Sequence, residues 1–141
     1  MIGKAVLDQA KAFLAWDVFP ELSIQLVETS QAVSYYTPPS GRSSLVVFYE
    51  RGKDDFSFPL FLLFHEAGHH LQWRRAEQNR RAQQFWDAVN LTTGPEKTAF
   101  EREGWDLGRD LFHKFLQEFG LDDKLLDTYD RTADRSIDTY R

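Results

Sequence analysis

Two hydrophobic patterns follow one another in the first fifty residues. Apolar residues recur first at three- and four-residue spacing, which predicts a helix that ends before Pro20: Ile2, Val6, Ala10, Phe13 and Leu14. Apolar and polar residues then alternate from Leu22 to Glu28, and strand-forming residues return in residues 32–37 and 44–50. Residues 38–41, Pro-Pro-Ser-Gly, predict a turn before the last run. We therefore expect one helix followed by three strands.

A longer helical pattern runs from Phe58 to about Glu77. Its apolar residues recur at helical spacing: Leu60, Phe61, Phe64, Ala67, Gly68 and Leu71. Ser57 is suited to cap this helix, and Pro59 fits its first turn. The apolar stretch is far shorter than the roughly 20 residues that cross a bilayer, so we expect a buried helix. Gly68 costs about 1 kcal/mol relative to alanine in a helix interior, so either another backbone packs closely there or the glycine is tolerated.

A second long helix is predicted between Thr93 and Gly120. Thr93, Gly94, Pro95 and Glu96 resemble a capping box, and Gly120 is a typical helix terminator. After it, residues 121–126 predict a short helix, and the polar tail at about 127–141 predicts a frayed or surface helix. The elements together predict an α+β fold, in which a small antiparallel or mixed sheet of about three strands packs on two principal helices.

Length and composition predict one domain spanning residues 1–141. The 141 residues are 42% apolar and 15% aromatic, which is enough for a core. The net charge of −5 argues against nucleic acid as a direct partner. The chain contains no cysteine, which fits a reducing compartment, and charged residues interrupt any N-terminal apolar stretch. These features predict a cytoplasmic protein without a signal peptide or a membrane partner.

The candidate chemistry lies on the first long helix, in the sequence His65-Glu66-Ala67-Gly68-His69. Histidines four residues apart lie on the same helix face, about 6 Å apart along the axis, so both imidazoles can reach one zinc ion. Glu66 stands one step round the helix, where it can take a proton from a water that zinc activates. The pattern therefore predicts a zinc-dependent hydrolase. Two further histidines, His70 and His113, point elsewhere on their helices and are expected to serve packing or the surface.

A third metal ligand must come from outside this motif. The absence of cysteine excludes a thiolate ligand. Gln72 and Arg75 occupy the positions where an extended motif would have a glycine and a third histidine. A carboxylate from the second long helix remains, and Glu101 and Glu103 are the candidates. Both stand on helix faces that carry apolar residues, so periodicity alone leaves the choice open.

Two segments resemble a known family. The sequences H-E-A-G-H-H-L at residues 65–71 and E-R-E-G-W-D-L-G-R-D-L at residues 101–111 are similar to the small gluzincin-type zinc metallopeptidases, especially the ImmA/IrrE-like group and the minigluzincins. The resemblance covers about residues 58–116. It implies a zincin-like fold with Zn²⁺ held by His65, His69 and Glu103, and with Glu66 as general base. The ligand glutamate of that group usually precedes alanine, whereas Gly104 stands here.

The resemblance also implies a partner and an arrangement around the site. A protein or peptide substrate is expected, and a regulatory protein is favoured because ImmA/IrrE-like proteins typically act on a DNA-binding repressor. Small zincins place an edge strand beside the motif helix, which would be residues 44–50 or a neighbouring strand unless residues 44–50 lie inside the sheet. Some minigluzincins fold a tail into their own cleft, so the tail at 127–141 is a candidate inhibitory segment. Asp106 and Asp110 are candidate partners for the ligand histidines. The alternative function is a catalytically silent zincin-like module that acts by binding.

Overall fold

The computed structural model describes residues 1–38 and 43–141. Its elements in chain order are α1 (Lys4–Ala12), the π-helix η1 (Phe13–Val18), β1 (Ser23–Thr29), β2 (Val33–Thr37), β3 (Ser44–Glu50), α2 (Ser57–Gln78), α3 (Ala82–Asn90), α4 (Pro95–Glu118) and α5 (Leu125–Asp138). They form two compact units, Met1–Ala67 and Gly68–Arg141. The boundary lies inside the continuous helix α2, so this division leaves the prediction of a single domain undecided. The predicted α+β class is confirmed.

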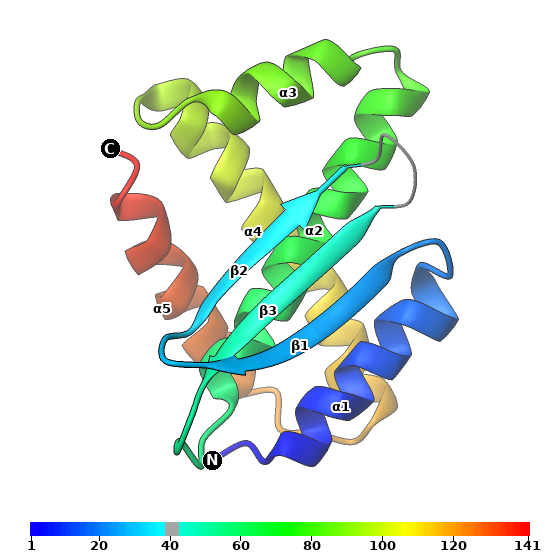
Figure 1. Cartoon of the computed structure of the whole chain (residues 1–141), viewed down its shortest axis with the longest axis vertical. Coiled ribbons are helices and arrows are strands. Elements are labelled where there is room, and N and C mark those ends of the chain that lie inside the picture. Colours follow the sequence, from blue (N-terminus) through cyan, green and yellow to red (C-terminus); the bar gives the residue numbers. More distant parts are fainter. Residues whose placement is uncertain (39–42) are drawn as a thin grey trace. The chain divides into compact units, whose positions relative to one another are not determined.

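The first unit contains a three-stranded mixed sheet with the strand order β1-β3-β2 (Figure 1). Strand β3 pairs in parallel with β1 and antiparallel with β2. Leu45 and Val47 of β3 are fully buried, as is expected of a central strand. All three predicted strands are confirmed. Of the alternatives left open for residues 44–50, the structure supports the interior strand, because β3 lies between the other two. Of the predicted turn at residues 38–41, all but Pro38 lies outside the described residues.

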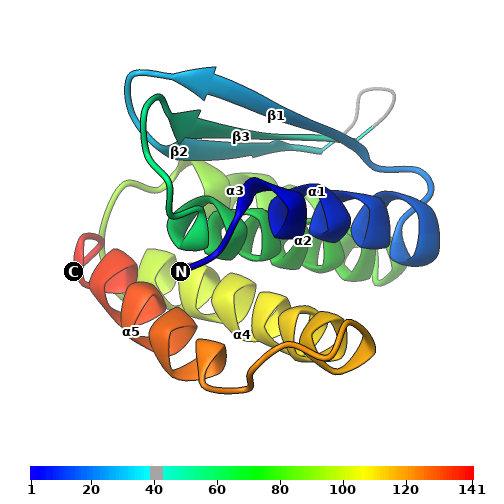
Figure 2. The same ribbon diagram turned by 90° about the horizontal axis from the view of Figure 1, so that it is seen from below.

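Helix α1 and η1 lie along one face of this sheet (Figure 2). Three of the apolar residues that the sequence pattern selects are buried here, Ala10, Phe13 and Leu14, together with Leu7, whereas Val6 is only partly buried. The last turn is wider than an α-helical turn, since the Phe19 amide donates to the Leu14 carbonyl five residues earlier, at 2.7 Å. The helical stretch ends before Pro20, as predicted.

The N-terminus of α2 is capped by Asp55 rather than by Ser57. One Asp55 carboxylate oxygen accepts hydrogen bonds from the Ser57 hydroxyl at 2.6 Å and from the Ser57 amide at 3.1 Å. The same oxygen accepts a bond from the Ile2 amide at 3.1 Å. The Ser57 hydroxyl bond contributes most to lowering the pKa of Asp55 below its usual value, because these donors favour the carboxylate form. Ser57 is the first residue of the helix, and Asp55 fixes where the helix begins.

The second unit is helical, and α4 and α5 lie side by side in it (Figure 2). Tyr129 of α5 is fully buried and stacks on Phe112, and its hydroxyl donates to the Trp105 carbonyl at 2.7 Å. Burial raises the pKa of the Tyr129 phenol well above its usual value. At the start of α4 the N-cap is Gly94, which uses no side-chain bond. The capping-box prediction there is therefore wrong.

The polar tail is an ordered amphipathic helix. Residues 125–138 form α5, whose apolar face is buried: Leu126, Tyr129, Ala133 and Ile137. Ion pairs join its polar side to α4, with Arg109 bonding Asp130 at 2.8 Å and Arg102 bonding Asp134 at 3.0 Å. Removal of the tail would expose Tyr129's partners on α4, so truncation would test folding as well as inhibition. Among the described residues, no helix is long and apolar enough to cross a membrane.

Candidate metal centre

Helix α2 presents both motif histidines in a buried setting. His65 and His69 are each 6% exposed, and Glu66 between them is 7% exposed. The helix continues for more than two turns beyond His69, so the positions of both rings are fixed by regular backbone. The predicted helix around the motif is confirmed, and its buried face includes the two candidate ligands.

The helix α4 approaches α2 closely at glycine positions. A Cβ atom added to Gly68 would fall on the Gly104 carbonyl oxygen and lie 2.8 Å from the Gly108 amide nitrogen. A Cβ atom on Gly104 would lie 2.6 Å from Cε1 of His69. Backbone contacts this short require that no side chain intervenes. Of the two interpretations of Gly68 left open by the sequence, the structure therefore supports close packing of another backbone.

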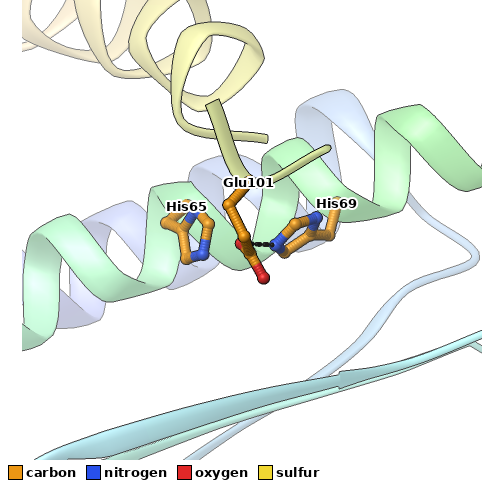
Figure 3. Close-up of side chains that lie close together, drawn as sticks. All are labelled: His65, His69 and Glu101. Carbon is orange, nitrogen blue, oxygen red and sulfur yellow. Dashed lines mark hydrogen bonds and ion pairs between the residues drawn. The ribbon is translucent and has the colours of Figure 1, made fainter. Parts of the chain in front are cut away.

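This contact brings Glu101 to the two histidines. His65, His69 and Glu101 each offer one ligand atom, and these atoms all lie within 4.8 Å of one another. Figure 3 shows the Glu101 side chain extending from α4 toward α2, with its carboxylate beside both rings. Oε2 of Glu101 is 2.9 Å from Nε2 of His69. The family resemblance favoured Glu103 in this position, whereas the structure brings the alternative, Glu101, to the two histidines.

Glu101 rather than Glu103 lies beside the histidines because of the side of α4 that packs inward. The buried residues Glu101, Gly104, Trp105 and Gly108 follow one another at three- and four-residue spacing. Glu103 lies two residues from Glu101, which is about 200° round the helix, and it is exposed. Glycines at 104 and 108 mark the face that meets Gly68, and Glu101 stands one turn before Gly104. This signal was present in the sequence, but the family resemblance pointed to the residue next to position 104.

The Gln72 side chain contacts the ring nitrogen of His69 that does not face Glu101. Its side-chain oxygen lies 2.6 Å from Nδ1 of His69. Its amide nitrogen donates to the Phe100 carbonyl at 2.9 Å and to Oε1 of Glu103 at 3.2 Å. The Phe100 ring stacks on the His69 ring at 5.0 Å between centroids. Glu103 therefore contacts Gln72, and through Gln72 it reaches His69.

A buried lysine, which sequence reasoning missed, accompanies Glu101. The side chains of Lys97 and Glu101 are 8% and 7% exposed, and Nζ of Lys97 lies 3.5 Å from Oε1 of Glu101. The same ammonium donates to the Ala88 and Val89 carbonyls, each at 3.2 Å, in the last turn of α3. A helix C-terminus favours a cation, so α3 helps to keep the ammonium in place. One oxygen of Glu101 thus faces Lys97 and the other faces His69.

A residue of the sheet contacts the candidate base Glu66. The Ser34 hydroxyl on β2 donates to Oε1 of Glu66 at 2.9 Å. The same oxygen lies 3.7 Å from Nε2 of His65. Proton transfer needs only one carboxylate oxygen, so a hydroxyl on Oε1 orients the group and is compatible with a base at Oε2.

The other predicted site residues take different places. Asp106 and Asp110 are exposed on α4, and both ring nitrogens of His69 already face Gln72 and Glu101. The aspartates are therefore not the partners of His69. Partial desolvation raises the pKa of Asp106, against the opposing charge of Arg102. His70 is 1% exposed, in agreement with a packing role, and His113 is partly exposed.

The three clustered residues fit a zinc ion. Two imidazole nitrogens and a carboxylate oxygen are the ligand set of many catalytic zinc sites. Bonds of roughly 2.0–2.1 Å in tetrahedral geometry separate the ligand atoms by about 3.4 Å. The observed ligand atoms, 2.9 Å apart for His69 and Glu101 and within 4.8 Å for all three, need only small movements to reach this spacing. Three protein ligands would leave one coordination position open.

No family model, curated protein or solved structure matches this chain. What the metal centre does must therefore be inferred from its own residues.

Proposed function

We propose that this protein is a zinc-dependent metallopeptidase that hydrolyses peptide bonds. The observation that carries the proposal is the buried cluster of His65, His69 and Glu101, with the carboxylate of Glu66 directly beside it. Three ligands that leave an open position are typical of catalytic zinc sites, whereas structural sites fill all four. A carboxylate next to the metal would be unnecessary in a structural site. Zn²⁺ is the proposed cofactor, and Glu101 replaces Glu103 as the proposed third ligand.

Each residue of the proposed site has a separate role in the reaction. Bound Zn²⁺ supplies Lewis-acid activation of water and of the substrate carbonyl group. Glu66 takes a proton from the attacking water and returns it to the departing amine. Ser34 keeps the Glu66 carboxylate oriented through its bond to Oε1. Lys97 holds the outer oxygen of Glu101, which leaves Oε2 directed toward His69 and the metal position.

The proposed substrate is an extended peptide segment of a regulatory protein. Strand β2 lies at an edge of the sheet, and Ser34 on this strand contacts Glu66. A peptide that adds to this edge by strand pairing would pass the proposed base. The proposed substrate strand therefore pairs with β2, which is one of the strands that the family resemblance left open. The cytoplasmic location stays a prediction.

Elemental analysis of bound metal tests the proposal directly. We would purify the wild type and the variants His65→Ala, Glu101→Ala and Glu103→Ala, load each with Zn²⁺ and remove the excess. We expect near-stoichiometric zinc in the wild type and in Glu103→Ala, and little zinc in the other two. Circular dichroism checks that each variant is folded.

The opposite results separate the alternatives. Zinc that is lost in Glu103→Ala and kept in Glu101→Ala would restore the first ligand assignment within the same enzyme class. A folded wild type that binds no divalent metal would exclude a metallopeptidase. Zinc binding without hydrolysis of any peptide in a diverse pool, in both wild type and Glu66→Gln, would favour the alternative of a silent zincin-like binding module.

A further inference from the structure

We propose that Gln72 is a positioning residue for the metal centre, and that it fixes the hydrogen of His69 on Nδ1 so that Nε2 is offered to the metal. The proposal rests on the function proposed above, and it concerns a residue outside the ligands and the base. Gln72 stands one turn after His69 on α2 and is 5% exposed. Its side chain is close to three polar groups, at 2.6, 2.9 and 3.2 Å.

The orientation of the Gln72 amide follows from its partners. The Phe100 carbonyl and the Glu103 carboxylate can only accept hydrogen bonds, so the group that faces both of them must be the amide nitrogen. The amide oxygen then faces His69, where it can only accept. Nδ1 of His69 must therefore carry the hydrogen of this bond. The other ring nitrogen, Nε2, is then the one that can be offered to a metal, and it faces Glu101.

Glu103 has a defined place in this arrangement. Its carboxylate and the Phe100 carbonyl together occupy the Gln72 amide nitrogen, and this keeps the amide from turning over. Glu103 lines an open hollow of about 330 Å³ together with Gln72, Arg75, Gln84 and Phe85. Because Glu103 borders open space, substitution there would leave no cavity in the core. A glutamate at this position thus serves the site from outside the ligand set.

Zinc affinity tests the proposal, measured by competition with a chelator of known affinity. We expect Gln72→Leu to weaken zinc binding by about 10–100-fold, the usual effect of losing the partner of a ligand histidine. Gln84→Leu makes the same chemical change in the same hollow and should bind zinc like the wild type. Glu103→Ala should lose less than Gln72→Leu, because the Phe100 carbonyl still accepts from Gln72.

An exchanged pair distinguishes positioning from simple packing. Gln72→Glu keeps an acceptor for Nδ1–H but places a carboxylate against Glu103 and the Phe100 carbonyl. Adding Glu103→Gln supplies an amide donor from the other side. We therefore expect Gln72→Glu/Glu103→Gln to bind zinc better than Gln72→Leu but less tightly than the wild type, because the Phe100 carbonyl still lacks its donor. Equal weakening in this double variant and in Gln72→Leu would contradict the proposal.

A metal-free measurement separates this proposal from the proposed function. Two-bond ¹⁵N–¹H NMR spectra of the imidazoles report which ring nitrogen carries hydrogen. We expect Nδ1–H for His69 in the metal-free wild type, and its loss in Gln72→Leu. A wild type that binds no zinc but shows Nδ1–H would end the peptidase proposal and leave standing only the assignment of the Nδ1 hydrogen to the bond with Gln72. Wild-type zinc affinity in Gln72→Leu, or a His69 ring without Nδ1–H in the metal-free wild type, would overturn the role of Gln72.

Discussion

Within the motif on α2, the proposed ligand His69 and the proposed base Glu66 are held by very different contacts. His69 is enclosed by the side chains of Gln72, Phe100 and Glu101, and Gly104 lies directly against its ring. Glu66, three residues earlier, receives one hydroxyl contact from Ser34 on an edge strand. Among the described residues, the ligand side is thus built by two packed helices, whereas Glu66 is contacted by the Ser34 hydroxyl and lies near the His65 ring.

This difference corresponds to what each group would have to do. A metal ligand must keep one geometry. A network of buried contacts achieves this, because any displacement of the ligand breaks several contacts at once. A general base must face first the attacking water and then the departing amine, so fewer fixed contacts suit it. We therefore expect changes near His69 to alter metal binding and stability, and changes near Glu66 to alter rate alone.

The largest expected effect is on the base side. Glu66→Gln removes the proton acceptor and keeps the size of the side chain, so we expect peptide hydrolysis to fall by about 10²–10⁴-fold. Bound zinc should remain at the wild-type level, because Glu66 is outside the ligand set. The measurement is cleavage of a mixed peptide pool by mass spectrometry, alongside elemental analysis. Glu77→Gln, on the exposed end of the same helix, is the matched control.

Loss of zinc together with loss of activity in Glu66→Gln would contradict the separation between the ligand side around His69 and the base side around Glu66. It would show that the carboxylate of Glu66 helps to hold the metal, and that the two halves of the motif are not functionally separate.

On the ligand side, the buried ion pair should dominate the stability of the metal-free protein. Lys97→Met leaves the Glu101 carboxylate buried without its cation, which typically costs about 3–5 kcal/mol of unfolding free energy. Urea denaturation in the presence of a chelator measures this loss. Lys114→Met removes an exposed lysine from the same helix and should change the unfolding free energy little.

A double variant identifies the source of the effect. Lys97→Met/Glu101→Gln removes both charges, and much of the stability lost in Lys97→Met should return. A loss below about 1 kcal/mol in Lys97→Met would mean that water screens the pair as it does at a surface.

Much of the fold was predictable because its signals are local. The period-two pattern located the strands, including residues 44–50 with the observed bounds, and the helical period located α2 and α4. Helix α3 was missed because the break before it has no glycine or proline. Arg80 makes that break in a left-handed conformation, with φ of 59°, which a non-glycine residue seldom adopts.

The site was predictable in part for the same reason. His65, Glu66 and His69 lie within five residues of sequence, so the helical repeat alone places them on one helix. The third ligand depends on which face of α4 meets α2, and the local period left two glutamates open. Lys97 and Gln72 stand one helical turn from Glu101 and His69, so helical spacing allows these pairs, but the spacing alone does not show that they are buried. Ser34 reaches Glu66 only through folding, because 32 residues separate the two.

A smaller effect is expected where the two helices touch the ligand ring. A Gly104→Ala methyl group would lie 2.6 Å from Cε1 and 2.9 Å from Nδ1 of His69, so the ring must move. Overpacking of this kind costs about 1–3 kcal/mol. We expect zinc affinity to fall about tenfold when measured by chelator competition, which corresponds to about 1.4 kcal/mol and lies in the lower half of that range. Gly3→Ala introduces the same methyl group into open space and should leave zinc affinity unchanged.

Unchanged zinc affinity in Gly104→Ala would show that the ligand side yields more readily than its contacts suggest.

The smallest expected effect concerns the hydroxyl contact on the base side. Ser34→Ala removes the hydroxyl that donates to Glu66, a bond whose net contribution is about 1 kcal/mol. We expect kcat/KM for peptide hydrolysis to fall about fivefold, with zinc affinity unchanged, because Ser34 donates to Glu66, which is outside the proposed ligand set. Ser44→Ala, on the neighbouring strand β3, is the matched control and should have wild-type kinetics. A loss approaching that of Glu66→Gln would contradict a mere orienting role. It would indicate that the Ser34 hydroxyl takes part in proton transfer, and the base side would then be as tightly specified as the ligand side.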